Sequence, residues 1–355
     1  MATPHPAGDP AALARWALGR MAASAAEDTR FDAVAESTEH RPAPLEPAGH
    51  YGWRDAARWS GHGPDAPGPA GRPAPVRRRL TGLSTAALRR DAGAARDPLL
   101  ALADPARLIA GTASAASGRA AWSDGRPCVD VLLTPHPWNA APEDPWLPPT
   151  ATVLAVSVDL ATGLLLRARA HDAHGCFRSG ALRGLRTDRP GTRPEEREAH
   201  VLARMATGLL DPVRLRAHVT TGPDGTPPLG TGRDTAGPPP RTWRVTTPGP
   251  PPRTTTVSGD YVPDLTDPAT ARLAELLTPA RLVSRLTDVT ATGPHAIRAT
   301  TRPSSPTPRS AWLPEDALTC HLTLDPATGI LLSARTETPS GTVRHHYEVT
   351  AHETW

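Results

Sequence analysis

A stretch of about twenty residues occurs twice in this chain, and the second occurrence follows the first after about 166 residues. The first reads VSVDLATGLLLRARAHDAHG from Val156 to Gly175, and the second reads LTLDPATGILLSARTETPSG from Leu322 to Gly341. Shorter matches upstream keep the same order, as in two copies of one structural unit. Because 355 residues are enough for two domains of ordinary size, we predict one domain over residues 1–187 and a second over residues 188–355.

Each copy has the local signals of helices and of short antiparallel strands. Asp9 followed by Pro10 is typical of a helix start, and Pro194 takes the corresponding place in the second copy. The repeated segment indicates a meander of strands, in which the loops DLATG and DPATG place a glycine where a hairpin needs positive φ. These signals together predict an α+β fold built on antiparallel sheets.

The strands of this meander have one apolar face in both copies. It carries Leu154, Val156, Val158, Leu164 and Leu166 in the first copy, and Cys320, Leu322, Leu324, Ile330 and Leu332 in the second. Burial of ten such side chains is worth about 15 to 30 kcal/mol, so something must cover the face. Two interpretations remain open. Either the protein's own helices cover it, or these ten residues line the binding site of an exchangeable apolar ligand.

Three motifs of each copy carry a resemblance to a known family. In the first copy they are Asp104-Pro105 with Leu108 and Gly111, Gly125-Arg126-Pro127 through Pro135, and Val156 to Gly175, and their equivalents in the second copy begin at Pro279, Gly293 and Leu322. In this order they resemble the periplasmic lipoprotein-carrier (LolA-like) family and the related sensor domains that regulate envelope-stress sigma factors. The resemblance implies two tandem half-open antiparallel β-barrels, each with helices covering a concave face that holds acyl chains. The chain departs from that family in its two fused units, its lack of an export signal and its low aromatic content of 4%.

The chain has 39 basic residues, and all of them are arginine, a bias typical of a GC-rich genome. Because arginine keeps its proton at ordinary pH, Schiff-base chemistry and a P-loop lysine are excluded. The formal net charge of +3 predicts no strong attraction to nucleic acid. The longest run of arginines is Arg77, Arg78 and Arg79, which indicates either a solvated strand edge or a contact for an acidic partner.

The sequence offers no recognisable reaction centre. His171, His174 and Cys176 could present two nitrogens and a sulfur to a metal, but they lie at a hairpin turn, and the second copy has threonine and serine near these positions. The chain also lacks a Gly-x-Ser-x-Gly elbow and a glycine-rich phosphate loop. We therefore expect no metal, no cofactor and no enzymatic activity.

Two tryptophans, Trp138 and Trp146, lie in the proline-rich segment from Pro135 to Pro149. Tryptophan is enriched at the energetic centres of protein interfaces. This pair and the run Arg77 to Arg79 are therefore the candidate surface for a protein partner. The other interpretation of the segment is a loop that packs over the rim of the barrel.

Two hypotheses for the function follow. The first is a binding or carrier module without enzymatic activity, which holds an acyl chain, a lipid or an extended apolar peptide in a half-barrel. The second is a regulatory or scaffold protein with closed cavities, which contacts a partner protein through its surface. The amino terminus has no basic start followed by an apolar core, and no segment reaches the ~18 apolar residues of a membrane span, so we expect a cytoplasmic protein. A chain trimmed of its export signal would look the same.

Overall fold

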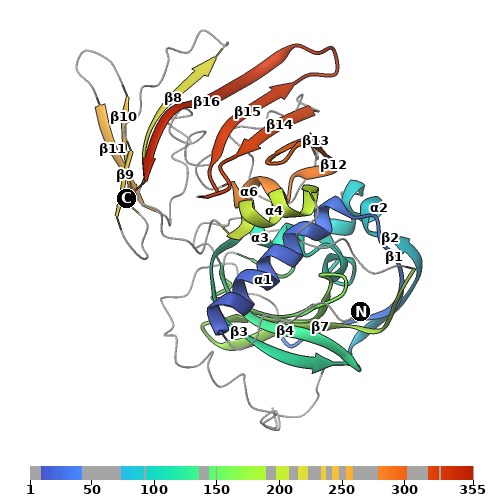
Figure 1. Cartoon of the computed structure of the whole chain (residues 1–355). Helices are drawn as coiled ribbons and strands as arrows, with labels where there is room; N and C mark the ends of the chain where they lie inside the picture. The colour runs from blue at the N-terminus through green and yellow to red at the C-terminus, as the bar shows by residue number, and fades with distance from the viewer. Residues whose placement is uncertain are drawn as a thin grey trace.

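The computed structural model places the chain in three antiparallel sheets and a layer of helices. It describes residues 9–41, 73–91, 93–135, 144–148, 150–188, 197–207, 215–222, 233–236, 242–247, 253–258, 279–301, 319–327 and 329–354. The helices lie between the two larger sheets, as Figure 1 shows. The predicted α+β class, with open antiparallel sheets and helices packed on them, is confirmed.

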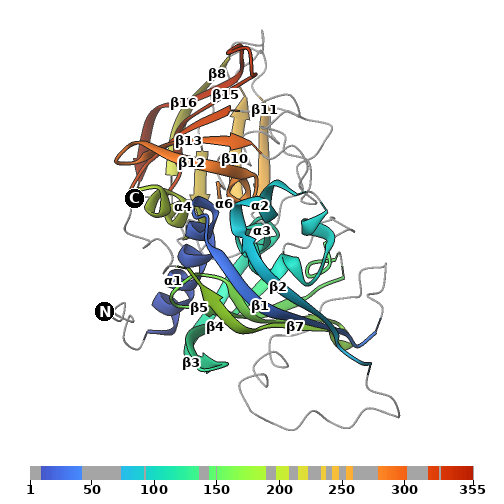
Figure 2. The same cartoon turned by 90° about the vertical axis from the view of Figure 1, so that its right-hand side faces the viewer.

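The first large sheet, called here the N-terminal sheet, has seven strands in the order β2-β1-β7-β6-β5-β4-β3. Its strands are β1 (Arg30–Glu39), β2 (Val76–Ser84), β3 (Thr112–Ser123), β4 (Arg126–Pro135), β5 (Val153–Asp159), β6 (Leu165–Asp172) and β7 (Gly175–Thr187). β2 and β3 are the two edges and do not pair with each other, so the sheet is a half-open barrel. Figure 2 shows this sheet curving below the helices.

The second large sheet, called here the C-terminal sheet, has six strands in the order β12-β13-β14-β15-β16-β8. Its strands are β8 (Leu215–Gly222), β12 (Leu286–Gly293), β13 (Ala296–Thr301), β14 (Thr319–Leu324), β15 (Leu331–Glu337) and β16 (Val343–Thr354). A third sheet contains β9 (Arg233–Ala236), β10 (Thr242–Thr247) and β11 (Arg253–Ser258). β11 corresponds in the sequence to β2, but it pairs with β10 and does not extend the C-terminal sheet.

The helices join the two large sheets. They are α1 (Pro10–Ala23), α2 (Thr85–Arg90), α3 (Ala106–Ala110), α4 (Arg197–Thr207), α6 (Ala280–Val283) and the short 3-10 helices η1 (Ser24–Ala26), η3 (Ala94–Arg96) and η4 (Leu100–Ala103). The predicted first helix is confirmed: Asp9 caps α1 by accepting the amide of Ala11 at 3.0 Å, and Pro10 is its first residue. α1 packs on α4, and α3 packs on α6.

The repeated segment forms the same hairpin turn in both large sheets. Gly163 and Gly329 have φ angles of 76° and 75°, a conformation that favours glycine. The amide of Gly163 donates to the carbonyl of Asp159 at 2.9 Å, and the amide of Gly329 donates to that of Asp325 at 2.8 Å. The glycine positions predicted from the DLATG and DPATG loops are therefore confirmed.

Candidate functional site

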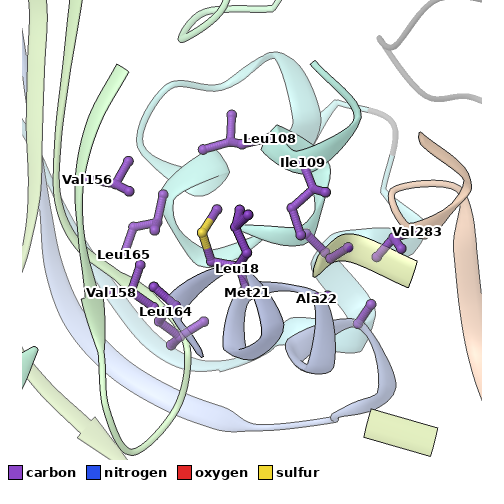
Figure 3. Packing of buried hydrophobic residues seen from close by; sticks show 14 of the residues in the cluster. Leu18, Met21, Ala22, Leu108, Ile109, Val156, Val158, Leu164, Leu165 and Val283 are labelled. Carbon is purple, nitrogen blue, oxygen red and sulfur yellow. The ribbon is translucent and has the colours of Figure 1, made fainter. Parts of the chain in front are cut away.

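The apolar face predicted in the first copy is the centre of the protein's core. All five of its side chains are 0 to 1% exposed: Leu154, Val156, Val158, Leu164 and Leu166. In Figure 3, Leu18 and Met21 of α1 and Leu108 and Ile109 of α3 lie against this face. Helices of the same chain therefore cover this face, as in the first of the two interpretations of the sequence.

α1 lies directly against the N-terminal sheet because small residues allow it to do so. A Cβ atom on Gly118 of β3 would lie 2.6 Å from the amide nitrogen of Ala14, which is closer than real Cβ atoms come to backbone. At the other end of α1, the guanidinium of Arg20 donates to the carbonyl of Ala161 at 2.9 Å and forms an ion pair of 3.3 Å with Glu27. The close approach at Gly118 and the contacts of Arg20 together fix α1 over the apolar face.

The apolar face predicted in the second copy is also covered. Leu332 is half-buried. The other four side chains are 0 to 5% exposed: Cys320, Leu322, Leu324 and Ile330. They belong to one apolar cluster with Leu202 and Met205 of α4 and Leu282 and Val283 of α6. The helices at the centre of the molecule therefore serve both sheets.

A bulge interrupts the strict alternation expected across the repeated hairpin. Val158 pairs with Leu165, and Leu166 is the extra residue in β6. The second copy repeats this arrangement, with Leu331 in the paired position and Leu332 as the extra residue. Leu165 and Leu331, both 0% exposed, therefore share the inner face, which the sequence pattern did not predict.

The helices between the two large sheets are closely packed against each other. A Cβ atom on Gly19 of α1 would lie 3.3 Å from the Cβ atom of Ala203 of α4. At the start of α4, the carboxylate of Glu198 accepts the backbone amide of Ala291, on β12, at 3.0 Å. These contacts hold α4 between the helices of the first copy and the strands of its own sheet.

Trp146 is not an exposed partner contact, because its side chain is 0% exposed. Its indole nitrogen donates to the carbonyl of Pro98 at 3.1 Å. A Cβ atom on Gly180 would lie 2.8 Å from the indole ring, so this glycine makes room for it. The structure therefore corrects the partner interpretation for Trp146 and supports the loop that packs on the barrel. Trp138 lies outside the described residues.

The run Arg77 to Arg79 lies on β2, an edge strand of the N-terminal sheet. The guanidinium of Arg77 is 2.9 Å from the carboxylate of Glu36, and Arg78 forms an ion pair with Asp97. All three arginines are exposed. This is the solvated strand edge that the sequence predicted, and a contact of these arginines with an acidic partner stays a prediction.

Trp122 is a surface residue that the sequence reasoning missed. It lies at the end of β3, the other edge of the N-terminal sheet, opposite Pro127, and is 72% exposed. A signal was available: Asp124 and Gly125, with φ angles of 53° and 73°, form the two-residue hairpin turn that an Asp-Gly pair favours. That turn places Trp122 near the tip of a hairpin at the edge of the sheet, where its side chain is exposed.

The buried charges of the N-terminal sheet serve the fold. The guanidinium of Arg126 binds both carboxylate oxygens of Asp159, at 2.8 and 2.9 Å, and Asp159 is 0% exposed. The same carboxylate accepts the amide and the hydroxyl of Thr162, at 2.9 and 2.7 Å. This cluster ties β4 to the β5–β6 turn, and all its polar groups are engaged in holding the turn.

Two groups that could carry chemistry have shifted pKa values. Burial and the nearby charge of Asp130 raise the pKa of the Cys128 thiol to about 12. Burial, and then the charge of Arg169, lower the pKa of His171. Within the described residues, no three histidine, cysteine, aspartate or glutamate side chains gather in a group that could hold a metal ion. In the same part of the chain, no helix is long and apolar enough to span a membrane.

Comparison with known proteins gives only distant matches. The chain matches no protein-family model and no curated protein sequence. Among solved structures it is similar to MucB, with 13% identity and a TM-score of 0.27 over 95% of this chain and 92% of that one. It is also similar to the Pseudomonas aeruginosa MucA/MucB complex (12%, TM-score 0.24, 95% and 93% covered) and to MucB in complex with MucA(peri) (12%, TM-score 0.23, 68% and 92% covered). Likeness at this level carries no functional residue over to this chain.

Proposed function

We propose that this protein is a binding module without enzymatic activity, which recognises a partner protein through its outer surface. The observation that supports this proposal is the burial of Leu154, Val156 and Val158 at 0% exposure beneath α1 and α3. A carrier needs a concave face that a ligand can enter. Here the first such face is buried beneath side chains of the same chain.

An apolar ligand would have to displace α1 to reach this face. α1 is fixed by the close approach of Ala14 to Gly118 and by the hydrogen bond from Arg20 to Ala161. Displacement would also expose Leu18 and Met21, both 0% exposed, at a cost of about 1.5 to 3 kcal/mol for each side chain. Surface recognition needs none of these changes.

An engineered disulfide separates the two functions. In a Cys176→Ser background, Gly19→Cys with Ala203→Cys is expected to link α1 to α4, because a Cβ added at Gly19 would lie 3.3 Å from the Cβ of Ala203, slightly below the range of about 3.5 to 4.5 Å found in disulfides. Oleate, added to the oxidised and reduced forms, is followed by native mass spectrometry. We expect neither form to bind oleate. One oleate per chain in the reduced form and none in the oxidised form would establish the carrier instead.

Photo-crosslinking in the cells that naturally make the protein tests partner binding. The photoreactive residue p-benzoylphenylalanine replaces Trp122, and in a control it replaces Val76, which is 63% exposed on the opposite edge strand. We expect one discrete protein adduct at position 122 and none at position 76. Lipid adducts, or equal labelling of many proteins at both positions, would contradict the proposal.

A further inference from the structure

Four basic side chains lie in one row across the C-terminal sheet. Direct pairing places His346 opposite Arg335, Arg335 opposite His321, and His321 opposite Arg298. Residues directly opposite each other in antiparallel strands point to the same face. We call His346, Arg335, His321 and Arg298 the basic row; its strands, β16 to β13, lie side by side in Figure 1.

The basic row lies on the outer face of the sheet. The neighbouring residues on β14, Cys320 and Leu322, point to the opposite face and are 0 and 1% exposed. The side chains of Arg335 and His321 are 49% and 40% exposed, Arg298 is exposed, and His346 is half-buried. A ligand in solution can therefore reach the whole row.

Among the residues that the structure describes, the row has fewer negative charges beside it than positive ones. Glu337, 20% exposed, is shared by Arg335 at 2.6 Å and His321 at 3.7 Å. Glu348 is a second carboxylate on this face; it is exposed and lies opposite Ser333, beside the row. Within the described residues, neither Arg298 nor His346 forms an ion pair. Like charges directly opposite each other destabilise a sheet, so the row gains from an added anion.

The fold does not need this row. In the N-terminal sheet the equivalent row is Ser179, Arg169, Ala155 and Leu132, paired in the same way, and it holds a single basic residue. The first copy thus forms the same strands without the basic side chains. Because the fold forms without them, the basic side chains of the C-terminal sheet are candidates for the recognition of a ligand.

We propose that the basic row is a docking surface for an acidic, extended segment of a partner protein. This inference rests on the proposed function, because it names a class of partner for the outer surface. Adjacent strands are about 4.8 Å apart, so the row spans about 14 Å, which an extended segment of four or five residues covers.

The charge of the row favours an acidic protein segment over nucleic acid. It has two permanent charges, Arg298 and Arg335, and a nucleic-acid surface generally neutralises more phosphates than that. The formal net charge of the whole chain is only +3. Carboxylate side chains also match guanidinium groups in geometry and bind them in pairs.

Fluorescence anisotropy with the full chain tests the proposal. The probe is a fluorescein-labelled octaglutamate peptide, measured in dilute buffer. We expect the double variant Arg298→Ser with Arg335→Ser to lower the affinity about tenfold.

Arg169→Ser, in the equivalent row of the N-terminal sheet, is the matched control and is expected to change the affinity less than about twofold. The proposal is overturned if this control weakens binding as much as the double variant Arg298→Ser with Arg335→Ser. Tighter binding of a labelled oligothymidylate of the same charge would assign the row to nucleic acid instead. If octaglutamate does not bind but the crosslinker at position 122 still captures one protein, the row is not the docking surface and the proposed function stands. Circular dichroism of each variant confirms that the fold is retained.

Discussion

A Cβ atom on Gly163 would lie 2.5 Å from the carbonyl oxygen of Arg20. Gly163 is in the β5–β6 turn, has a φ of 76° and is buried, whereas Arg20 is near the end of α1. The turn of the repeated segment is therefore also a point where the first helix contacts the N-terminal sheet. The contact involves the backbone of α1, so a side-chain rotation cannot relieve it.

Gly163→Ala should therefore destabilise the protein more than the left-handed backbone alone requires. Gly125→Ala is the matched control, because Gly125 has a φ of 73° and an added Cβ would meet nothing within 4 Å. We expect a loss of about 1 to 2 kcal/mol for Gly125→Ala. For Gly163→Ala we expect about 3 kcal/mol or more, from the same backbone term and the steric clash. Urea unfolding measures both, and equal losses would show that α1 does not press on this turn.

Trp146 and Trp122 should respond differently to truncation. Trp146→Ala leaves a cavity at the centre of the fold and removes the hydrogen bond to Pro98, so we expect a loss of about 3 to 5 kcal/mol in the free energy of unfolding. Trp122→Ala removes a side chain that is 72% exposed, and we expect a change below about 0.5 kcal/mol. A stability loss at Trp122 comparable to that at Trp146 would mean that Trp122 is packed, not exposed.

The features that the sequence predicted are those that depend on near neighbours. The Asp9-Pro10 helix start and the turn at Gly163 follow from local backbone preferences, and the alternating burial of β6 follows from the two-residue period of a strand. The position of Trp146 depends on Gly180, which is distant in the sequence and vacates the space for the ring. No local pattern contains that information.

The extra residue of each hairpin and the basic row could not be predicted from the sequence for a related reason. Leu166 fits an alternating pattern in the sequence, and only the strand register reveals it as a bulge. His321 and Arg298 are separated by a long segment, and they become neighbours through the pairing of β13 with β14. The sequence could suggest the strands, but cross-strand neighbours depend on register, which the whole sheet determines.

The cysteines should show which side chains are inside the two sheets. Thiol reagents attack the thiolate, and the pKa of Cys128 is raised to about 12 by burial. Cys320 is 0% exposed, whereas Cys176 is half-buried in the hairpin between β6 and β7. We expect a chromogenic disulfide reagent to modify Cys176 alone in the native protein, and all three thiols after unfolding. Cys176→Ser should abolish the native reaction, and fast labelling of Cys320 would show that the C-terminal sheet is open to solvent.

His171 should make the stability depend on pH. Because burial lowers its pKa in the folded state, the unfolded chain binds the proton more readily whenever the pH is below the ordinary histidine value of about 6.5. The stability contribution is therefore complete above that value and is lost as the pH falls through the folded-state pKa. We expect His171→Asn to lose less stability than the wild type between about pH 7 and about pH 5. His174→Asn, an exposed position on the same hairpin, is the control and should keep the wild-type dependence. Urea unfolding at a series of pH values measures the three curves, and a His171→Asn curve parallel to that of the wild type would assign the dependence to other groups.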